Sequence, residues 1–177
     1  MHETTSEVYR MKYFRLTVLV LVLILVLGLC TPTSAEGAYA PDFTVIDGSG
    51  HKVKLSDKLD GKPLIFNIWA SWCPPCVSEL PHFDEAAKLY EGQITFMMVN
   101  LTDGGYETVE GAKAFIKSKG YSFPVYYDTL GEVSGIYLGQ YIPMTWFINA
   151  DGTILGYFEG GMEKDTLLNC ISQLLKG

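Results

Sequence analysis

Apolar and polar residues follow one another along this chain in blocks that predict a mixed α/β domain. Residues 64–69 form a nearly continuous apolar run, which is typical of a central strand buried on both faces of a sheet. Residues 94–99 form a second such run, and residues 74–90 between them carry apolar side chains at helical spacing. This order of strand, helix and strand predicts two parallel strands joined by a crossover helix.

Further blocks extend this pattern. We expect additional helices at 108–119, 132–138 and 163–176, and additional strands at 125–127, 145–148 and 154–158. Turn sequences at 149–152 and 47–50 each predict an antiparallel hairpin. The last helix is expected to turn four apolar side chains inward, namely Leu167, Ile171, Leu174 and Leu175. The expected fold class is α/β, a central mixed β-sheet flanked by helices with an added N-terminal β-hairpin.

Residues 1–35 are the most strongly biased segment. Three basic residues, Arg10, Lys12 and Arg15, precede a run from 16 to 35 that has no charged side chain. A run of about 20 apolar residues crosses a bilayer as a helix, so we expect a signal peptide or a signal-anchor membrane segment at 16–35. The basic side remains in the cytoplasm, which places the rest of the chain outside it. Cleavage, retention and lipidation at Cys30 all stay open, as does a start at Met1 or Met11.

The rest of the chain is expected to form a linker at 36–41 and one folded domain at 42–177. The formal net charge of the whole chain is -7 at pH 7, and no basic stripe follows the leader. Phosphate groups would be repelled by such a domain, so nucleic acid is excluded as an expected partner. We expect the domain to be a monomer.

The candidate chemistry centres on two cysteines, Cys73 and Cys76, at the start of the helix expected at 74–90. Their spacing permits a redox-active disulfide that forms and breaks without much backbone movement. Cys73 is expected at the exposed helix end, where the macrodipole lowers a thiol pKa and favours the attacking thiolate. Cys76 is then the resolving thiol. Pro74 and Pro75 lack amide donors, which predicts a milder depression of the Cys73 pKa.

Two structural roles for the pair compete with redox chemistry. A zinc site would need a second pair at matched spacing, and the remaining candidates, Cys30, Cys170, His51 and His82, form none. A passive disulfide over so short a loop would stabilise little. We therefore expect redox chemistry with no metal and no organic cofactor, and we expect Cys170 to be a small buried apolar residue.

Several motifs resemble the thioredoxin superfamily: Trp-Ala-Ser-Trp-Cys-Pro-Pro-Cys at 69–76, Pro81, and Ile-Pro-Met-Thr at 142–145. The motifs at 40–43, 55–57 and 76–81 are similar to the membrane-anchored branch typified by ResA and TlpA. The resemblance implies a thioredoxin-like fold in which Pro143 is cis and faces the cysteines. It also implies that the backbone of Ile142 and Pro143 binds the substrate chain, and we expect Trp72, Pro74 and Pro75 to complete this docking surface.

The proton chemistry is expected to differ from that of cytoplasmic thioredoxins. Those proteins hold a buried aspartate six residues before the first cysteine, where this chain has Asn67, which cannot titrate. Glu79 lies one helical turn past Cys76 and matches the active-site glutamate of the anchored branch. We expect it to be the catalytic acid and base, with a raised pKa if it is shielded from water. The alternative is a solvated surface glutamate. Gly160–Gly161 predicts a turn with close backbone approach to the site.

These features predict an enzyme, an extracytoplasmic protein-disulfide oxidoreductase. The resemblance implies reduction of exported proteins such as apocytochrome c in cytochrome c maturation, with a membrane protein as electron donor. A peroxiredoxin-like peroxidase is an alternative because Ala-Pro-Asp-Phe at 40–43 also opens those proteins, although Ala70 stands where they carry threonine. A non-enzymatic copper-delivery module is another, although such modules space their cysteines by three residues. The direction of electron transfer stays open.

Overall fold

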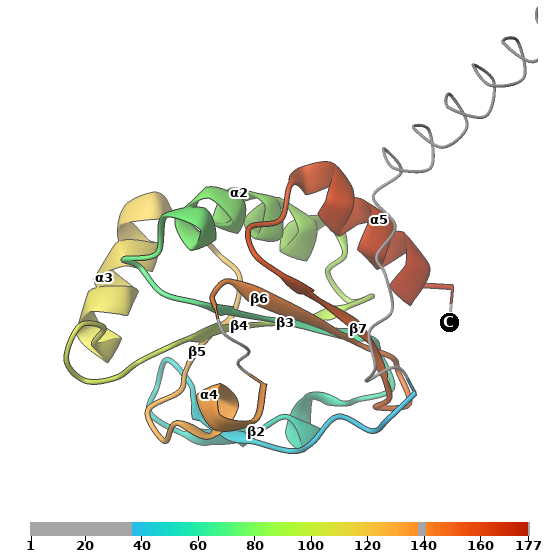
Figure 1. The fold of residues 1–177 in the computed structure, drawn as a ribbon, viewed down its shortest axis with the longest axis horizontal. Helices are drawn as coiled ribbons and strands as arrows, with labels where there is room; N and C mark the ends of the chain where they lie inside the picture. The colour runs from blue at the N-terminus through green and yellow to red at the C-terminus, as the bar shows by residue number, and fades with distance from the viewer. Residues whose placement is uncertain (1–36, 138–140, 177) are drawn as a thin grey trace, which may run out of the picture.

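The structure is a computed structural model that describes residues 37–137 and 141–176, so the predicted leader lies outside the described residues (Figure 1). The expected α/β class is confirmed, with a central mixed sheet flanked by helices (Figure 1). Within the two described ranges, no helix has the length and apolar character needed to cross a membrane.

Strands and helices follow the predicted order with small shifts at their ends. The strands are β1 (Thr44–Ile46), β2 (Lys52–Lys54), β3 (Leu64–Trp69), β4 (Thr95–Asn100), β5 (Val125–Tyr127), β6 (Met144–Ile148) and β7 (Ile154–Glu159). The helices are the 3-10 turn η1 (Ser56–Lys58), α2 (Pro74–Leu89), α3 (Val109–Lys119), α4 (Glu132–Tyr137) and α5 (Lys164–Leu174). Each helix and strand predicted after the leader is therefore present in the described residues.

All seven described strands form one sheet in the order β2-β1-β5-β4-β3-β6-β7. The strands β3, β4 and β5 run parallel, because helices connect them. The strands β6 and β7 pair antiparallel beside β3, and β1 and β2 pair antiparallel beyond β5, so both predicted hairpins are confirmed. The N-terminal hairpin thus extends the far edge of the sheet.

The sheet is buried on both faces. Alternate residues of β3 enter opposite cores, with Ile65 and Trp69 in one and Phe66 and Ile68 in the other. Helices α2, α3 and α5 cover the first face, and α4 covers the second (Figure 1). A strand covered on both faces reads as a continuous apolar run, which explains the pattern of β3.

Two details differ from expectation. Leu175 was predicted to face inward, but it is 42% exposed because α5 ends at Leu174 and the following turn carries Leu175 away from the core. The expected linker is also tied down in its described part. The Gly37 N–H donates to the Ile154 carbonyl and the Ala40 N–H donates to the Gly152 carbonyl, both at 2.9 Å. These residues therefore lie beside the start of β7.

The register of the sheet places the cysteine pair. Strand β3 ends at Trp69, and a short turn leads into α2, with a hydrogen bond from the Cys73 N–H to the Ala70 carbonyl at 3.3 Å. Strand β6 runs antiparallel to β3 with Met144 opposite Ile68. The start of β6 therefore lies at the same end of the sheet as the carboxyl end of β3. Helix α2 also begins at this end.

Candidate active site

The two cysteines form a disulfide with an S–S distance of 2.16 Å and a Cα–Cα distance of 5.3 Å. Cys73 is the N-cap of α2, and its sulfur accepts a hydrogen bond from the Cys76 N–H at 3.3 Å. Pro74 and Pro75 occupy the first turn of the helix, where their missing N–H groups cost least. The amide of Cys76 therefore supplies a donor to Cys73 that the two prolines cannot.

The expected exposure of Cys73 is wrong for this disulfide form, in which the residue is only 3% exposed. Its sulfur lies 3.7 Å from the carbonyl oxygen of Ile142, in the loop that precedes β6. A disulfide sulfur has no hydrogen to donate, so this is a contact here. In the dithiol form the Cys73 S–H could donate to the same oxygen.

The Ile142–Pro143 peptide bond is cis, as the resemblance implied. Ile142 is half-buried, whereas Pro143 is buried and offers little side chain to a partner. The carbonyl of Pro143 accepts a hydrogen bond from the Gly160 N–H at 2.9 Å, which ties this loop to the end of β7. The part of this loop that lies next to the Cys73 sulfur is therefore the backbone carbonyl of Ile142.

The expected docking residues around the disulfide lie at the surface. Trp72, which precedes Cys73, is 56% exposed, and Pro74 and Pro75, which follow it, are also exposed. Trp69, by contrast, is fully buried in the core, as predicted. Beside Trp72 lies an open cleft of about 440 Å³, lined by residues from the loops that follow β4 and β5. The three exposed apolar side chains therefore flank the disulfide, next to a cleft that polar side chains also line.

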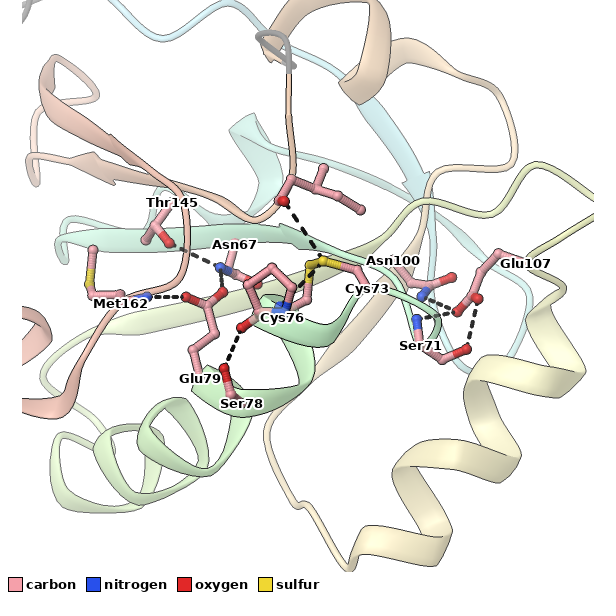
Figure 2. The surroundings of a disulfide bond; sticks show 12 residues. Asn67, Ser71, Cys73, Cys76, Ser78, Glu79, Asn100, Glu107, Thr145 and Met162 are labelled. Atoms are coloured by element: carbon pink, nitrogen blue, oxygen red, sulfur yellow. Dashed lines mark hydrogen bonds between the residues drawn. A yellow bond between two sulfur atoms is a disulfide. The ribbon is translucent and has the colours of Figure 1, made fainter.

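Glu79 is a buried carboxyl group, and its side chain turns from α2 towards Asn67 on β3 (Figure 2). The residue is 1% exposed, which excludes the alternative of a solvated surface glutamate. Asn67 Nδ2 donates to Oε1 at 2.8 Å, and the Met162 N–H donates to Oε2 at 2.7 Å. Burial raises the pKa of Glu79 to about 7, although these two hydrogen bonds lower it in part.

The amide of Asn67 can serve both protonation states of Glu79. As placed, Nδ2 donates to Glu79 and to Thr145 Oγ1 at 2.9 Å, while the buried Oδ1 has no partner. A half-turn of the amide would present Oδ1 to a protonated Glu79 and to the Thr145 hydroxyl, which can donate as well as accept. Asn67 would thus keep one hydrogen bond to Glu79 and one to Thr145 in either protonation state of the carboxyl group.

The close backbone approach predicted at Gly160–Gly161 is confirmed. Gly160 has a φ of 98°, which favours glycine. A Cβ on Gly161 would lie 3.3 Å from the Pro75 Cβ and 3.4 Å from the Pro75 carbonyl oxygen. This contact lets the next residue, Met162, bring its N–H to Glu79. The connection between β7 and α5 therefore forms one wall of the site.

A second buried carboxyl group was missed by the sequence reasoning. Glu107 is 2% exposed and lies in the loop between β4 and α3. It accepts hydrogen bonds from the N–H and hydroxyl of Ser71, two residues before Cys73, and from Asn100 Nδ2 (Figure 2). The available signal was Asn100, a polar residue at the carboxyl end of a strand, where sites tend to form in parallel sheets.

These groups together can support thiol-disulfide exchange. The structure brings Cys73, Cys76, Glu79 and the Ile142–Pro143 loop together at one end of the sheet, where β3 ends and β6 begins. Cys170 is buried within α5, as expected. Within residues 37–137 and 141–176, no cluster of three histidine, cysteine or acidic side chains could hold a metal ion.

Comparison with known proteins agrees with this chemistry. Residues 35–171 match the redoxin family. The thiol-disulfide oxidoreductase ResA of Bacillus subtilis (strain 168) is 31% identical over 144 residues, which cover 81% of this chain and 78% of that protein. The redoxin match spans both cysteines and Glu79.

Solved structures show the same fold. The pneumococcal exposed lipoprotein thioredoxin of Streptococcus pneumoniae strain TIGR4 superposes with a TM-score of 0.63 at 31% identity, covering 76% of this chain and 100% of that one. A thiol:disulfide interchange protein of the thioredoxin family from Chlorobium tepidum TLS superposes with a TM-score of 0.66 at 27% identity, covering 81% of this chain and 99% of that one. The predicted thioredoxin-like fold is confirmed.

Proposed function

We propose, from the premise that this chain belongs to the redoxin family and to the ResA-like branch of the thioredoxin superfamily, that it reduces disulfides in exported proteins outside the cytoplasm. The chain is a protein-disulfide oxidoreductase that acts on protein dithiols and disulfides. The observation that carries the exchange chemistry is the Cys73–Cys76 disulfide with the buried Glu79 one helical turn away, whose pKa of about 7 lets it accept and release a proton at neutral pH. The reductive direction is proposed from the resemblance to the ResA-like branch.

The proposed cycle begins with both cysteines reduced. The Cys73 thiolate attacks one sulfur of a substrate disulfide, forms a mixed disulfide, and displaces the other substrate sulfur as a thiolate that takes up a proton. Glu79 accepts the proton of the Cys76 thiol, and the Cys76 thiolate then attacks the Cys73 sulfur. The second substrate sulfur leaves as a thiolate and takes a proton in turn. Two electrons and two protons have passed to the substrate.

The surroundings of the pair support this use of Glu79. Cys76 is buried, so its thiol meets little bulk water that could accept its proton. Glu79 lies one turn further along the same helix, and Asn67 and Met162 hold its carboxylate after it has lost its own proton. Since Asn67 cannot titrate, it leaves Glu79 as the ionisable member of this network.

The proposed location is the outer face of the cell membrane. The apolar segment at 16–35, preceded by basic residues, supports an N-terminal anchor or signal. The similarity to a pneumococcal exposed lipoprotein supports an exposed position. A membrane protein would return electrons to the Cys73–Cys76 disulfide after each cycle, and the enzyme would act as a monomer.

The proposed substrate class is exported proteins with a vicinal cysteine pair, such as the haem-attachment site of apocytochrome c. The resemblance of the sequence motifs to the membrane-anchored branch suggests this choice, and the similarity to a thiol-disulfide oxidoreductase supports a protein disulfide as substrate. The exposed Trp72 offers an apolar contact, and the cleft beside it, which polar side chains such as Thr102 and Asp128 also line, offers room for an extended or unfolded segment. An unfolded apoprotein presents such segments readily.

The test is to trap the partner as a mixed disulfide. In Cys76→Ser the resolving thiol is absent, so we expect Cys73 to hold its substrate covalently, and mass spectrometry of the trapped species identifies the protein and the cysteine. Cys73→Ser is the matched control and should trap nothing. Partners confined to exported proteins with paired cysteines would support the proposal. Cytoplasmic partners, or equal trapping by both variants, would contradict it.

A further inference from the structure

Glu107 has no place in the proposed proton transfer, yet it is buried and has several partners. Its carboxylate accepts the Ser71 N–H at 3.0 Å and the Ser71 hydroxyl at 2.8 Å. A third hydrogen bond comes from Asn100 Nδ2 at 2.7 Å. Hydrogen bonds to a buried charged acceptor are among the stronger ones in proteins, and leaving such a charge unpaired is costly.

The loop that carries Glu107 fixes both the N–H and the carbonyl of this residue. Asp103 Oδ1 accepts the Gly105 N–H at 2.7 Å and the Glu107 N–H at 2.9 Å. The Gly104 N–H donates to the Glu107 carbonyl at 3.0 Å. The Glu107 backbone is therefore held before its side chain reaches Ser71.

Asn100 is also oriented for this contact. The Thr102 hydroxyl donates to Asn100 Oδ1 at 2.9 Å, which leaves Nδ2 directed at Glu107. Asn100 is the last residue of β4, and Ser71 lies just past the end of β3. The carboxylate thus joins the carboxyl ends of two neighbouring parallel strands (Figure 2).

Ser71 belongs to the short turn that delivers Cys73 to the start of α2. That turn is closed by the hydrogen bond from the Cys73 N–H to the Ala70 carbonyl. Glu107 holds it through both the backbone and the side chain of Ser71, so it restricts where Cys73 can lie relative to the Ile142 carbonyl. A nucleophile reacts fast only when its supporting residues hold it close to the productive geometry.

We propose that Glu107 is a positioning residue for Cys73, which it holds in the attacking position through its hydrogen bonds to Ser71 and Asn100. It acts through geometry, since its charge has no part in the exchange step. The inference extends the oxidoreductase activity and does not depend on the substrate or location proposed above.

Substituting Glu107 by glutamine or by alanine separates the effect of its hydrogen bonds from the effect of its charge. In Glu107→Gln, Oε1 can accept both N–H donors and Nε2 can donate to the Ser71 hydroxyl, so all three hydrogen bonds can persist without the charge. In Glu107→Ala all three are lost. Asp84→Ala is a matched control, because Asp84 is a buried carboxylate that accepts the N–H and hydroxyl of Ser122, but it lies in the second half of α2.

The experiment measures how fast the Cys73 thiolate attacks glutathione disulfide across pH 5 to 10, in reduced full-length protein carrying Cys76→Ser. In each attack the Cys73–glutathione bond forms, the glutathione disulfide breaks, and one glutathione thiolate leaves. We expect the limiting rate at high pH to fall about tenfold in Glu107→Ala and to return to within about twofold of the parent in Glu107→Gln. Asp84→Ala should stay within about twofold of the parent even with a lowered Tm.

Three results would overturn the positioning role. They are an unchanged limiting rate in Glu107→Ala, a Glu107→Gln rate as low as that of Glu107→Ala, and an Asp84→Ala rate as low as that of Glu107→Ala. The first removes any role in the attack, the second shows that charge matters, and the third shows a general effect of destabilisation. A parent protein that does not exchange at all would contradict the oxidoreductase activity instead.

Discussion

Glu79 shows how one residue combines burial with hydrogen bonding. Burial alone would make its charged form very costly, and the N–H groups of Asn67 and Met162 recover part of that cost. The balance leaves the carboxyl titrating near neutral pH. A group in that range can both release and accept a proton under ordinary conditions, which neither a solvated glutamate nor an asparagine can do.

The raised pKa of Glu79 also predicts how stability depends on pH. The carboxyl has an ordinary pKa of 4.5 and a folded-state pKa of about 7, so the folded chain binds this proton more tightly than the unfolded chain. The stabilising contribution is complete below about pH 4.5, falls as pH rises towards 7, and is then lost. We expect the oxidised protein to lose about 3 kcal/mol of unfolding free energy across this window from Glu79.

Urea unfolding of the oxidised protein at pH 5, 6, 7 and 8 measures this loss. Glu79→Gln should remove the slope between pH 5 and 7 and be more stable than the parent at pH 8. The exposed Glu91 gives a matched control, since Glu91→Gln should keep the slope. Equal slopes in the parent and Glu79→Gln would mean that the carboxyl titrates normally.

At the scale of elements, the site is held by connections as much as by helices and strands. The connection from β7 to α5 passes so close to the start of α2 that a Cβ on Gly161 would touch Pro75. The loop before β6 carries the cis peptide bond, and the loop after β4 carries Glu107. Each connection leaves the sheet near the end of β3, so together they surround the disulfide.

Gly161→Ala tests the role of this close approach. The added Cβ meets the rigid ring and carbonyl of Pro75 at 3.3 and 3.4 Å, so the connection must shift by a few tenths of an ångström. The Met162 N–H should then move away from Glu79. Because that hydrogen bond lowers the pKa of Glu79, we expect the pKa to rise above its parent value.

A carbon-13 NMR titration of the Glu79 carboxyl measures the pKa directly. Gly135→Ala is a suitable control, because a Cβ on Gly135 meets nothing within 4 Å and alanine is favoured in a helix. It should leave the Glu79 titration unchanged. The predicted role of the connection fails if Gly161→Ala titrates like the parent.

At the scale of the whole molecule, the two cores share the same strands. Phe66 lies on the α4 face of β3, where its ring centroid is 5.4 Å from that of Phe43 and 4.8 Å from that of Tyr137. Cys170 is a residue of α5 and lies in the core on the opposite face of the sheet. Since one sheet separates and supports both cores, we expect them to unfold together.

Phe66→Ala tests this cooperativity. Loss of the ring leaves a cavity and should lower the unfolding free energy by about 3 to 5 kcal/mol. In the oxidised Phe66→Ala protein, alkylation of Cys170 and the change in tryptophan fluorescence should then begin at the same urea concentration, and that concentration should be lower than in the parent. Leu175→Ala, at an exposed position, should change stability by less than about 0.5 kcal/mol. Protection of Cys170 beyond the fluorescence transition would indicate that the two faces unfold separately.

The sequence by itself determined the order of the elements and the chemistry of the cysteine pair. Apolar runs and helical stripes are local patterns, so β3 and α2 could be placed within one or two residues. The spacing of Cys73 and Cys76 is also local, because one helical turn brings the two sulfurs together. The close approach at Gly161 was predicted because glycine has no Cβ and lets the backbone come near another segment.

Only the tertiary structure decided how deep each polar side chain lies and what it contacts. Glu79 could have been a surface residue by its sequence pattern, and its burial depends on Asn67, twelve residues earlier, and Met162, 83 residues later. Glu107 itself gave no local signal, and Asn100 marked only the strand end, because a polar loop residue becomes buried only when two strand ends meet beside it. The cover over Cys73 likewise comes from Ile142, 69 residues away. Such contacts are set by the register of the sheet, which a single sequence does not display.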